Sequence, residues 1–331
     1  MSVSKSNVPY SNSRSVVLKM ESLPCNPILK FKPDTLDVIR KSFNLDQREL
    51  NEAIDRFEEW LNKQEHFVKK DFSRDYIERT IIQGKGSVEK AKSQMDKLCT
   101  LKTLLPKFFK NCDIKTEFKD ISQIAWLIPL PKMTEDYCRV YIVKINSKEF
   151  TSAHFMEYYR FNIVLYEYLK ATDYVKGFIV IHDWRDLNCL DLVTKMNVIE
   201  LQQFMTILME GYKATIHGIH IITESKVIDL FTSTLKQILS PKMAARVHVY
   251  TNIESLYNIV EKDILPVEYG GKEVSVEELN KKWMEIISTE EHTAYMKEMN
   301  GACTDESRRS KLDFNNEYIG MPGTFRTLTV D

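Results

Sequence analysis

Two histidines in one short segment are the first residues whose types and spacing could do chemistry. His217 and His220 lie in "IHGIHII", residues 216–222, where the apolar run predicts a buried strand. Their imidazole nitrogens could bind a metal ion or act as an acid and a base. Side chains alternate between the two faces of a strand, so residues at an odd separation point to opposite faces. The two histidines are therefore not expected to share a metal ion or a substrate atom.

Tyr166 and Lys170 form a second candidate, the Y-x-x-x-K pair of short-chain dehydrogenases, in which lysine lowers the pKa of tyrosine. Such an enzyme also needs a glycine-rich phosphate turn after its first strand. The "GKG" at 84–86 lies between expected helices and lacks a third glycine, and "GGKE" at 270–273 lacks the other residues of a phosphate-binding loop. There is no G-x-S-x-G for a serine hydrolase. The sequence therefore predicts a protein that is not an enzyme, with no catalytic residues and no cofactor.

A cluster of His182, Asp183, Asp186 and Asp191 follows another expected strand, "GFIVIHD", in "HDWRDLNCLD". A metal ion could bind at such a strand end. The favoured interpretation is that Asp183 and Asp186 accept backbone N–H bonds and order the turn into the next helix. The six cysteines have no ligand-like spacing, so we predict ordinary thiols and no metal site.

The composition limits the classes of partner. The chain has 331 residues, 43% of them hydrophobic, which suffices for a sizeable core. Lysine and arginine number 46 against 47 aspartate and glutamate, so no global charge draws the chain onto nucleic acid. No signal-peptide core and no run of about 20 apolar residues is present. We expect a cytoplasmic protein that binds no nucleic acid.

The elements that must position these residues fall into two parts. Residues 33–105 have a helical apolar period, as in "DQRELNEAIDRFEEWLNKQ", and Pro106 with the polar residues 110–113 marks a boundary. Strands at 139–145, 177–183, 216–222 and 245–250 then alternate with helices at 153–170, 191–212 and 227–239. This alternation predicts an α/β fold with a mixed, largely parallel sheet flanked by helices, preceded by an all-helical part. A further helix contains "SVEELNKKWMEII", and "TDESRRSK" after Asn300 predicts a flexible linker.

Two of the expected helices are apolar over an unusually wide arc. The helix at 227–239 is apolar over about half its circumference, wider than the roughly 100° stripe of a surface helix. The helix at 153–170 is apolar nearly all round, interrupted by Asn162 and Tyr166, one turn apart. A thick core explains both patterns. That is the favoured interpretation from the pattern alone; the alternative is a lipid cavity between sheet and helices, with two polar groups to orient a ligand head.

Several motifs in order resemble the CRAL-TRIO lipid-binding family, in its tocopherol- and retinaldehyde-carrier branch. They are "WLNKQEHF", "SVEKAKSQMDKLCTLKTLLPKFF", "GFIVIHDWRDLN" for the family's G-x-x-x-I-x-D, "HGIHIIT", "ARVHVY" and "ILPVEYGG". The terminal "GTFRTLTVD" resembles insect members. The resemblance implies an N-terminal arm (1–30), a helical domain (31–112), a lipid-binding domain (113–290) and a C-terminal tail (291–331).

The resemblance also implies one small hydrophobic ligand, such as tocopherol, a retinoid, a carotenoid or a similar lipid, under a movable helix at 227–239, and transfer of that ligand between membranes. In the tocopherol carrier the positions of Asn162 and Tyr166 are serines, so Tyr166 is expected to shorten or reshape the cavity. The implied wall consists of Asn162, Tyr166, Phe178, Val180, His182, Phe204, Ile207, Leu208, Tyr212, Ile216, Ile219, Val227, Phe231 and Leu235.

A basic cleft for phosphoinositide heads is the last implied feature. Lys242 and Arg246 match its basic residues, whereas its other positions fall on Ile82, Thr215 and His217. The cleft is therefore expected to be weaker, with His217 contributing charge only when protonated. The expectation is a carrier in transient, peripheral contact with membranes. The alternative is a regulatory or scaffold module of the same fold that senses phospholipid.

Overall fold

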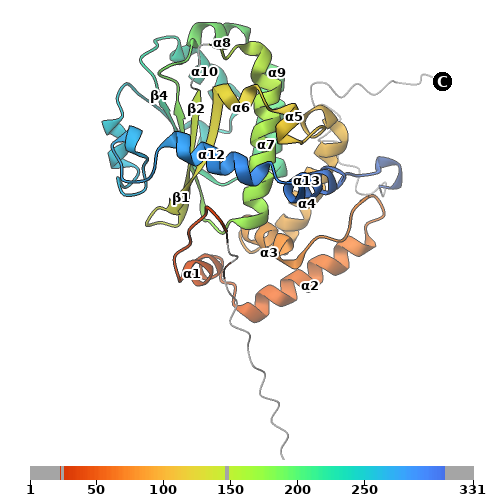
Figure 1. The fold of residues 1–331 in the computed structure, drawn as a ribbon. Coiled ribbons are helices and arrows are strands. Elements are labelled where there is room, and N and C mark those ends of the chain that lie inside the picture. Colours follow the sequence, from red (N-terminus) through yellow and green to blue (C-terminus); the bar gives the residue numbers. More distant parts are fainter. Residues whose placement is uncertain (1–22, 24–25, 146–148, 310–331) are drawn as a thin grey trace, which may run out of the picture.

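The helical unit predicted for the first third of the chain packs below a sheet, in the orientation of Figure 1. The computed structural model describes residue 23, residues 26–145 and residues 149–309, so most of the expected N-terminal arm and the end of the tail lie outside the described residues. The unit contains α1 (Thr35–Lys41), α2 (Gln47–Lys63), α3 (Arg74–Gln83) and α4 (Val88–Leu104).

The starts and buried faces of these helices follow from their sequences. Asp46 and Glu49 form a capping box at the start of α2, and the Ser87 hydroxyl accepts the Lys90 N–H at the start of α4, as predicted. The predicted apolar stripe of α2 is buried in the core of the helical unit: Leu50, Ile54, Phe57 and Leu61.

Five strands form one sheet in the order β1-β2-β3-β4-β5, with β1 antiparallel to β2 and the other pairs parallel. They are β1 (Ala125–Met133), β2 (Cys138–Ile145), β3 (Gly177–Asp183), β4 (Ile216–Ile222) and β5 (Val247–Tyr250). The predicted fold class, a mixed and largely parallel sheet flanked by helices, is confirmed. The sequence did not reveal β1, because Pro129 and Pro131 lack backbone donors and are tolerated only at a sheet edge.

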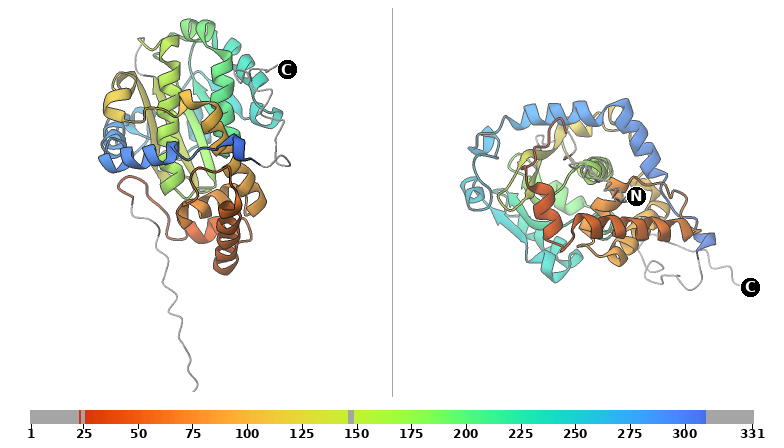
Figure 2. Two further views of the ribbon diagram at one scale, coloured as in Figure 1. Left: turned by 90° about the vertical axis from the view of Figure 1, so that its right-hand side faces the viewer. Right: turned by 90° about the horizontal axis from the view of Figure 1, so that it is seen from below.

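Three helices cover the sheet face that includes Phe178: α7 (Phe155–Thr172), α9 (Val198–Thr206) and α10 (Ile228–Ile238). Figure 2 shows α7 in yellow-green, running along the sheet. The predicted single helix at 191–212 is wrong. It divides into α8 (Cys189–Lys195), α9 and a π-helical turn η3 (Ile207–Gly211), because the Asn197 side chain caps a new helix start.

A β-bulge in β4 changes which residues share a face. Phe178 pairs with Ile216, but Ile179 pairs with Gly218, so His217 is the extra residue. Ile216 and Ile219 consequently lie on the same face although their separation is odd. His220 pairs with Ile181 and stacks on His248, whereas His217 is exposed on the cavity side. The predicted opposite faces for the two histidines are wrong, because the bulge breaks the alternation. A Cβ at Gly177 would meet His217 and one at Gly218 would meet His220, so both rings lie on the face opposite Phe178, with His217 exposed and His220 buried.

The last described residues, up to Arg309, pack against the helical unit. After α12 (Val276–Ile287) and α13 (Glu290–Asn300), the Lys102 ammonium donates to the Met299 carbonyl. The expectation of a flexible linker is wrong for residues 304–309, because Arg309 is buried in ion pairs with Asp96 and Glu306. Residues 310 and 311 lie outside the described residues, and the four domain boundaries stay predictions.

Shorter helical segments complete the described chain. They are η1 (Pro106–Phe108), α5 (Ile114–Glu117), α6 (Ile121–Ile124), η2 (Ser152–His154), α11 (Pro241–Ala244), η4 (Glu254–Asn258), η5 (Val267–Tyr269) and η6 (Glu306–Arg308).

Candidate functional site

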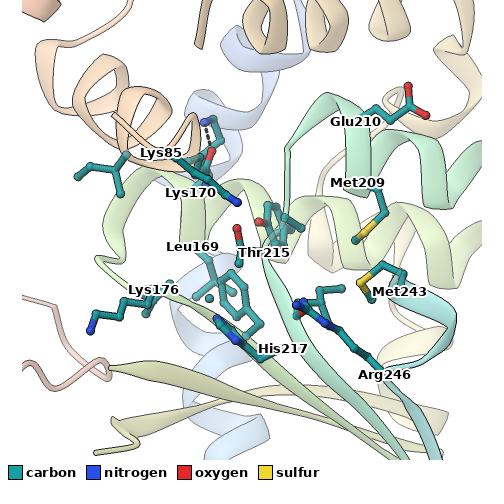
Figure 3. Close-up of a pocket in the computed structure, with 18 of the residues that line it drawn as sticks. Lys85, Leu169, Lys170, Lys176, Met209, Glu210, Thr215, His217, Met243 and Arg246 are labelled. Atoms are coloured by element: carbon teal, nitrogen blue, oxygen red, sulfur yellow. Dashed lines mark hydrogen bonds between the residues drawn. The ribbon is translucent and has the colours of Figure 1, made fainter. Parts of the chain in front are cut away.

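A cavity of about 830 Å³ opens where the helical unit meets the amino ends of β3 and β4. Its wall is drawn from α3 and the turn after it, the end of α7, the starts of β3 and β4, η3, and the segment from α10 to Arg246. Figure 3 shows side chains from these separate segments around one hollow. The volume is within the range of small-molecule sites in proteins.

The polar part of the wall is strongly basic. Six lysines and arginines line it, against two carboxylates. Both carboxylates form ion pairs with residues that do not line the cavity, Asp173 with Arg139 and Glu210 with Lys97. The cavity therefore presents positive charge to an entering ligand. Its basic residues are Arg79, Lys85, Lys170, Lys176, Lys242 and Arg246, with His217 beside them.

The phosphoinositide positions implied by the family resemblance come together in this cavity. Lys242, Arg246 and His217 all line it, as do the matched but uncharged Ile82 and Thr215. The sequence comparison missed Lys85, Lys170 and Lys176. These lysines come from segments that the matching did not include, and only the "GKG" turn and the Y-x-x-x-K motif had drawn attention to two of them.

Gly177 and Arg246 explain how His217 is held at the mouth of the cavity. A Cβ at residue 177 would lie 2.6 Å from His217 Cδ2 and from the Thr215 carbonyl oxygen, so only glycine fits there. The Arg246 guanidinium donates to the Ile216 carbonyl, beside the bulge. The first glycine of the G-x-x-x-I-x-D motif thus makes room for the bulged residue.

The apolar part of the wall includes three residues of the predicted lipid site: Tyr166, Phe178 and Ile216. The rings of Tyr166 and Phe178 are 5.6 Å apart, which joins α7 to the sheet. The sequence reasoning missed several other apolar wall residues, namely Leu169, Met205, Met209, Ile238, Leu239 and Met243. Methionine fills irregular space and adapts its shape, which suits a site for a flexible lipid.

Most of the remaining predicted wall residues lie deeper, between the sheet and its helices, and do not line this cavity. By register, Val180, His182 and Ile219 share the sheet face of Phe178. The Phe231 ring of α10 contacts Trp184, which in turn contacts His182. The others in the buried layer, or at its edge, are Asn162, Phe204, Ile207, Leu208, Tyr212, Val227 and Leu235.

The two polar groups expected to orient a ligand head differ in availability. Asn162 is already engaged, accepting the Tyr141 hydroxyl at 3.3 Å and donating to the Tyr158 carbonyl at 2.8 Å. The Tyr166 hydroxyl and His182 Nδ1 are buried with no hydrogen-bond partner among the described residues. Burial lowers the pKa of His182 to about 4, so its ring is neutral at physiological pH.

The aspartates after β3 order a turn. Arg185 donates to Asp183 at 2.8 Å, and Lys144 and the Tyr269 hydroxyl also contact this carboxylate. Burial opposes its ionisation, but the Arg185 hydrogen bond and the Lys144 charge prevail and lower its pKa to about 2. Within the described ranges, no three His, Cys, Asp or Glu side chains are grouped to hold a metal ion.

A mostly parallel sheet covered by helices, with a ligand-sized cavity at one end, defines an α/β ligand-binding protein. Residues 126–271 match the family model of the CRAL/TRIO domain, so this segment of the chain is similar to that domain. The matched segment contains the whole sheet except Ala125, together with α7 to α11. Proteins of this family are lipid-binding transfer proteins.

Curated relatives match parts of the chain. Clavesin-2 of Rattus norvegicus is 26% identical over 98 residues, which are 29% of this chain and 30% of that protein. Alpha-tocopherol transfer protein-like of Mus musculus is 23% identical over 169 residues, which are 50% of this chain and 49% of that protein. The chain thus spans half or less of the relatives' length. This chain also aligns with a crystal structure of Sfh5, with 14% sequence identity and a TM-score of 0.47. The alignment includes 82% of this chain and 99% of the Sfh5 chain.

Proposed function

We propose that this protein binds one hydrophobic ligand between the sheet and its covering helices and transfers it between membranes. The observation that carries the proposal is the cavity of about 830 Å³, which has an apolar wall from α7, β3 and η3. Most of the residues that line it belong to the segment that matches the CRAL/TRIO domain. Such a wall removes apolar ligand surface from water, which is the main source of affinity for a lipid.

The expected size of this effect explains why release needs a trigger. Burying about 400 to 500 Å² of a lipid at roughly 25 cal/mol per Å² contributes about 10 to 12 kcal/mol before entropy losses. Spontaneous dissociation is then slow. A movable α10 would open the layer beside Phe231 and Trp184, whose rings are 4.7 Å apart.

An exposed apolar surface on α8, α9 and α10 supports membrane contact at that end. Leu190, Ile199 and Leu230 are 58%, 51% and 54% exposed, and Val198 beside them is also exposed. The three helices meet at the upper end of the molecule in Figure 1. Within the described ranges, no helix could span a bilayer by its length and hydropathy. Contact is therefore proposed to be peripheral, through this surface.

The basic wall of the cavity supports binding of an anionic group as well as an apolar ligand. Lys242, Arg246 and His217 are proposed to contact a phosphoinositide head, with Lys85 and Lys176 restoring charge that the sequence comparison counted as lost. The same cavity fits the alternative function, a phospholipid-sensing regulatory or scaffold module. The two functions differ in whether the protein alone moves ligand between vesicles.

Extraction and transfer test the proposal. The purified protein is extracted with organic solvent and analysed by mass spectrometry, and its transfer of retinoid, tocopherol and phospholipid between vesicles is measured. We expect one ligand per chain and transfer by the protein alone. A bound lipid with a stable protein complex and little transfer would support the scaffold module. Recovery of no lipid, together with no uptake of any of the three, would contradict ligand binding.

A further inference from the structure

Both members of the Y-x-x-x-K motif line the cavity, Tyr166 in its apolar wall and Lys170 among its basic residues. Tyr166 and Lys170 lie one turn apart on α7, so their side chains are neighbours on one helix face. Figure 3 shows Lys170 among the side chains around the hollow. Lys170 is buried, whereas Lys85 and Lys242 of the same wall are exposed.

The Lys170 amine is held by acceptors on α3 and is 3% exposed. It donates to Gln83 Oε1 at 2.7 Å and to Thr80 Oγ1 at 3.0 Å. The Thr80 hydroxyl donates its only hydrogen to the Tyr76 carbonyl at 2.8 Å, so in its contact with Lys170 it must be the acceptor. These two bonds use both hydrogens of a neutral amine and leave its lone pair. The Tyr76 ring, 4.6 Å from Nζ, is a further neighbour.

The charge state agrees with this geometry. No carboxylate forms an ion pair with Lys170 among the residues that the structure describes. Burial lowers the pKa of Lys170 to about 7, the charges of Arg79 and Lys102 add to this effect, and Glu167 opposes it. The neutral amine is therefore populated near pH 7, whereas an exposed lysine is almost wholly protonated.

Tyr166 complements this amine as a hydrogen-bond donor. Its hydroxyl is buried without a partner in the described chain. Burial raises the pKa of Tyr166 well above its ordinary value, so the group stays a phenol. This is the reverse of the dehydrogenase arrangement, in which lysine lowers the pKa of the tyrosine. A buried phenol one helical turn from an amine, both lining one cavity, suits a ligand whose polar end is a carbonyl.

We propose that Lys170 and Tyr166 form a carbonyl-binding site in which the Lys170 amine condenses reversibly with a hydrophobic aldehyde. The inference rests on the proposed function, because the aldehyde must enter the lipid cavity. The Nζ lone pair forms a bond to the carbonyl carbon, and the C–O π pair moves to oxygen, towards which the Tyr166 hydroxyl donates. Both amine hydrogens pass to that oxygen, which leaves as water, so the products are one imine and one water. Neither oxidant nor reductant is consumed.

Reductive trapping tests this site. The full chain is incubated with hexadecanal and cyanoborohydride, which reduces an imine to a stable amine, and labelled peptides are mapped by mass spectrometry. We expect one adduct per chain, on Lys170. Lys170→Met should lose it, while Lys281→Met, an exposed lysine outside the cavity, should keep it. Tyr166→Phe should label the same residue about tenfold or more slowly, because it lacks the donor.

Folding is monitored by thermal unfolding. If Lys170→Met does not fold, Lys170→Arg replaces it, since arginine keeps donors for Gln83 and Thr80 but forms no imine. An adduct spread over exposed lysines, or undiminished in the Lys170 variant, would overturn the carbonyl site. Hexadecanol serves as the non-reactive analogue: if it binds and hexadecanal forms no adduct at Lys170, only this inference fails. If neither ligand binds, the proposed lipid site fails as well.

Discussion

Arg139 and Asp173 form a bidentate ion pair that is sealed from solvent. Arg139 Nη2 lies 2.8 Å from Asp173 Oδ1, and Nε lies 3.0 Å from Oδ2, with side chains that are 0% and 1% exposed. The pair joins β2 to the segment after α7, where Asp173 forms part of the cavity wall. It therefore fixes the end of α7, and with it Lys170, relative to the sheet.

Removing one partner of this pair should be costly. Arg139→Met leaves the Asp173 carboxylate buried without its cation, which should lower the free energy of unfolding by about 3 to 5 kcal/mol. Urea denaturation measures the loss. The double variant Arg139→Met/Asp173→Asn should recover part of it, because no buried charge remains. A single variant as stable as the parent chain would show that the pair is not sealed.

Removing the hydroxyl of Tyr166 and removing that of Tyr212 should have different effects on the free energy of unfolding. Their rings are 5.1 Å apart and both are buried, but Tyr212 donates to Glu167 Oε2 at 2.6 Å whereas Tyr166 has no partner in the described chain. Tyr166→Phe should leave the free energy of unfolding unchanged or raise it by up to about 1 kcal/mol, and Tyr212→Phe should lower it by about 1 to 3 kcal/mol. Equal losses in the two variants would imply an unseen partner for Tyr166.

The surface on α8 to α10 should control membrane binding. Leu230 is 54% exposed on α10, so Leu230→Asp should barely change the unfolding temperature. It should weaken vesicle binding about ten- to a hundredfold, because it removes one leucine from the contact. Val68→Asp, at a 61% exposed residue before α3, is the matched control. Equal binding of both variants in vesicle co-sedimentation would argue against this surface.

The lysines around the cavity should set the dependence on phosphoinositide. Lys85→Gln/Lys176→Gln should reduce binding to phosphoinositide-containing vesicles about tenfold or more, since each charge near an anionic head contributes about 1 kcal/mol. Lys119→Gln/Lys281→Gln makes the same change of net charge on exposed residues elsewhere and should retain binding. An equal loss in both variants would indicate only a general charge effect.

The ion pair between Arg309 and Asp96 of α4 should weaken in acid. Burial opposes ionisation of Asp96, but hydrogen bonds from His66 and Arg309 prevail and lower its pKa from 3.8 to about 2. Because the folded-state pKa is depressed, the stabilisation is complete above about pH 4 and is lost as the pH falls through about 2. It amounts to roughly 2 kcal/mol. Asp96→Asn should therefore be less stable than the parent at pH 6, with the difference closing by pH 2; urea titrations at both values measure it.

Local patterns predicted most of the elements. The apolar period identified α2 and α10, and alternation of strands with helices identified four of the five strands. They missed β1, because its two prolines read as a break, and they joined α8, α9 and η3 into one helix. At β1 the tertiary context overrides the local signal, because a sheet edge accepts proline. At Asn197 the reason is local: its side chain accepts the Ile199 and Glu200 N–H groups and caps a new helix.

By itself, the sequence determined that the fold is α/β and that Tyr166 and Lys170 lie one turn apart. These follow from chain geometry over a few residues. Only the tertiary structure decided that the bulge at His217 puts Ile216 and Ile219 on one face, and that Lys85, Lys170 and Lys176 meet Lys242 around one cavity. These contacts depend on how the packed layers position segments that are distant in the sequence, and a local hydrophobic pattern carries no information about that.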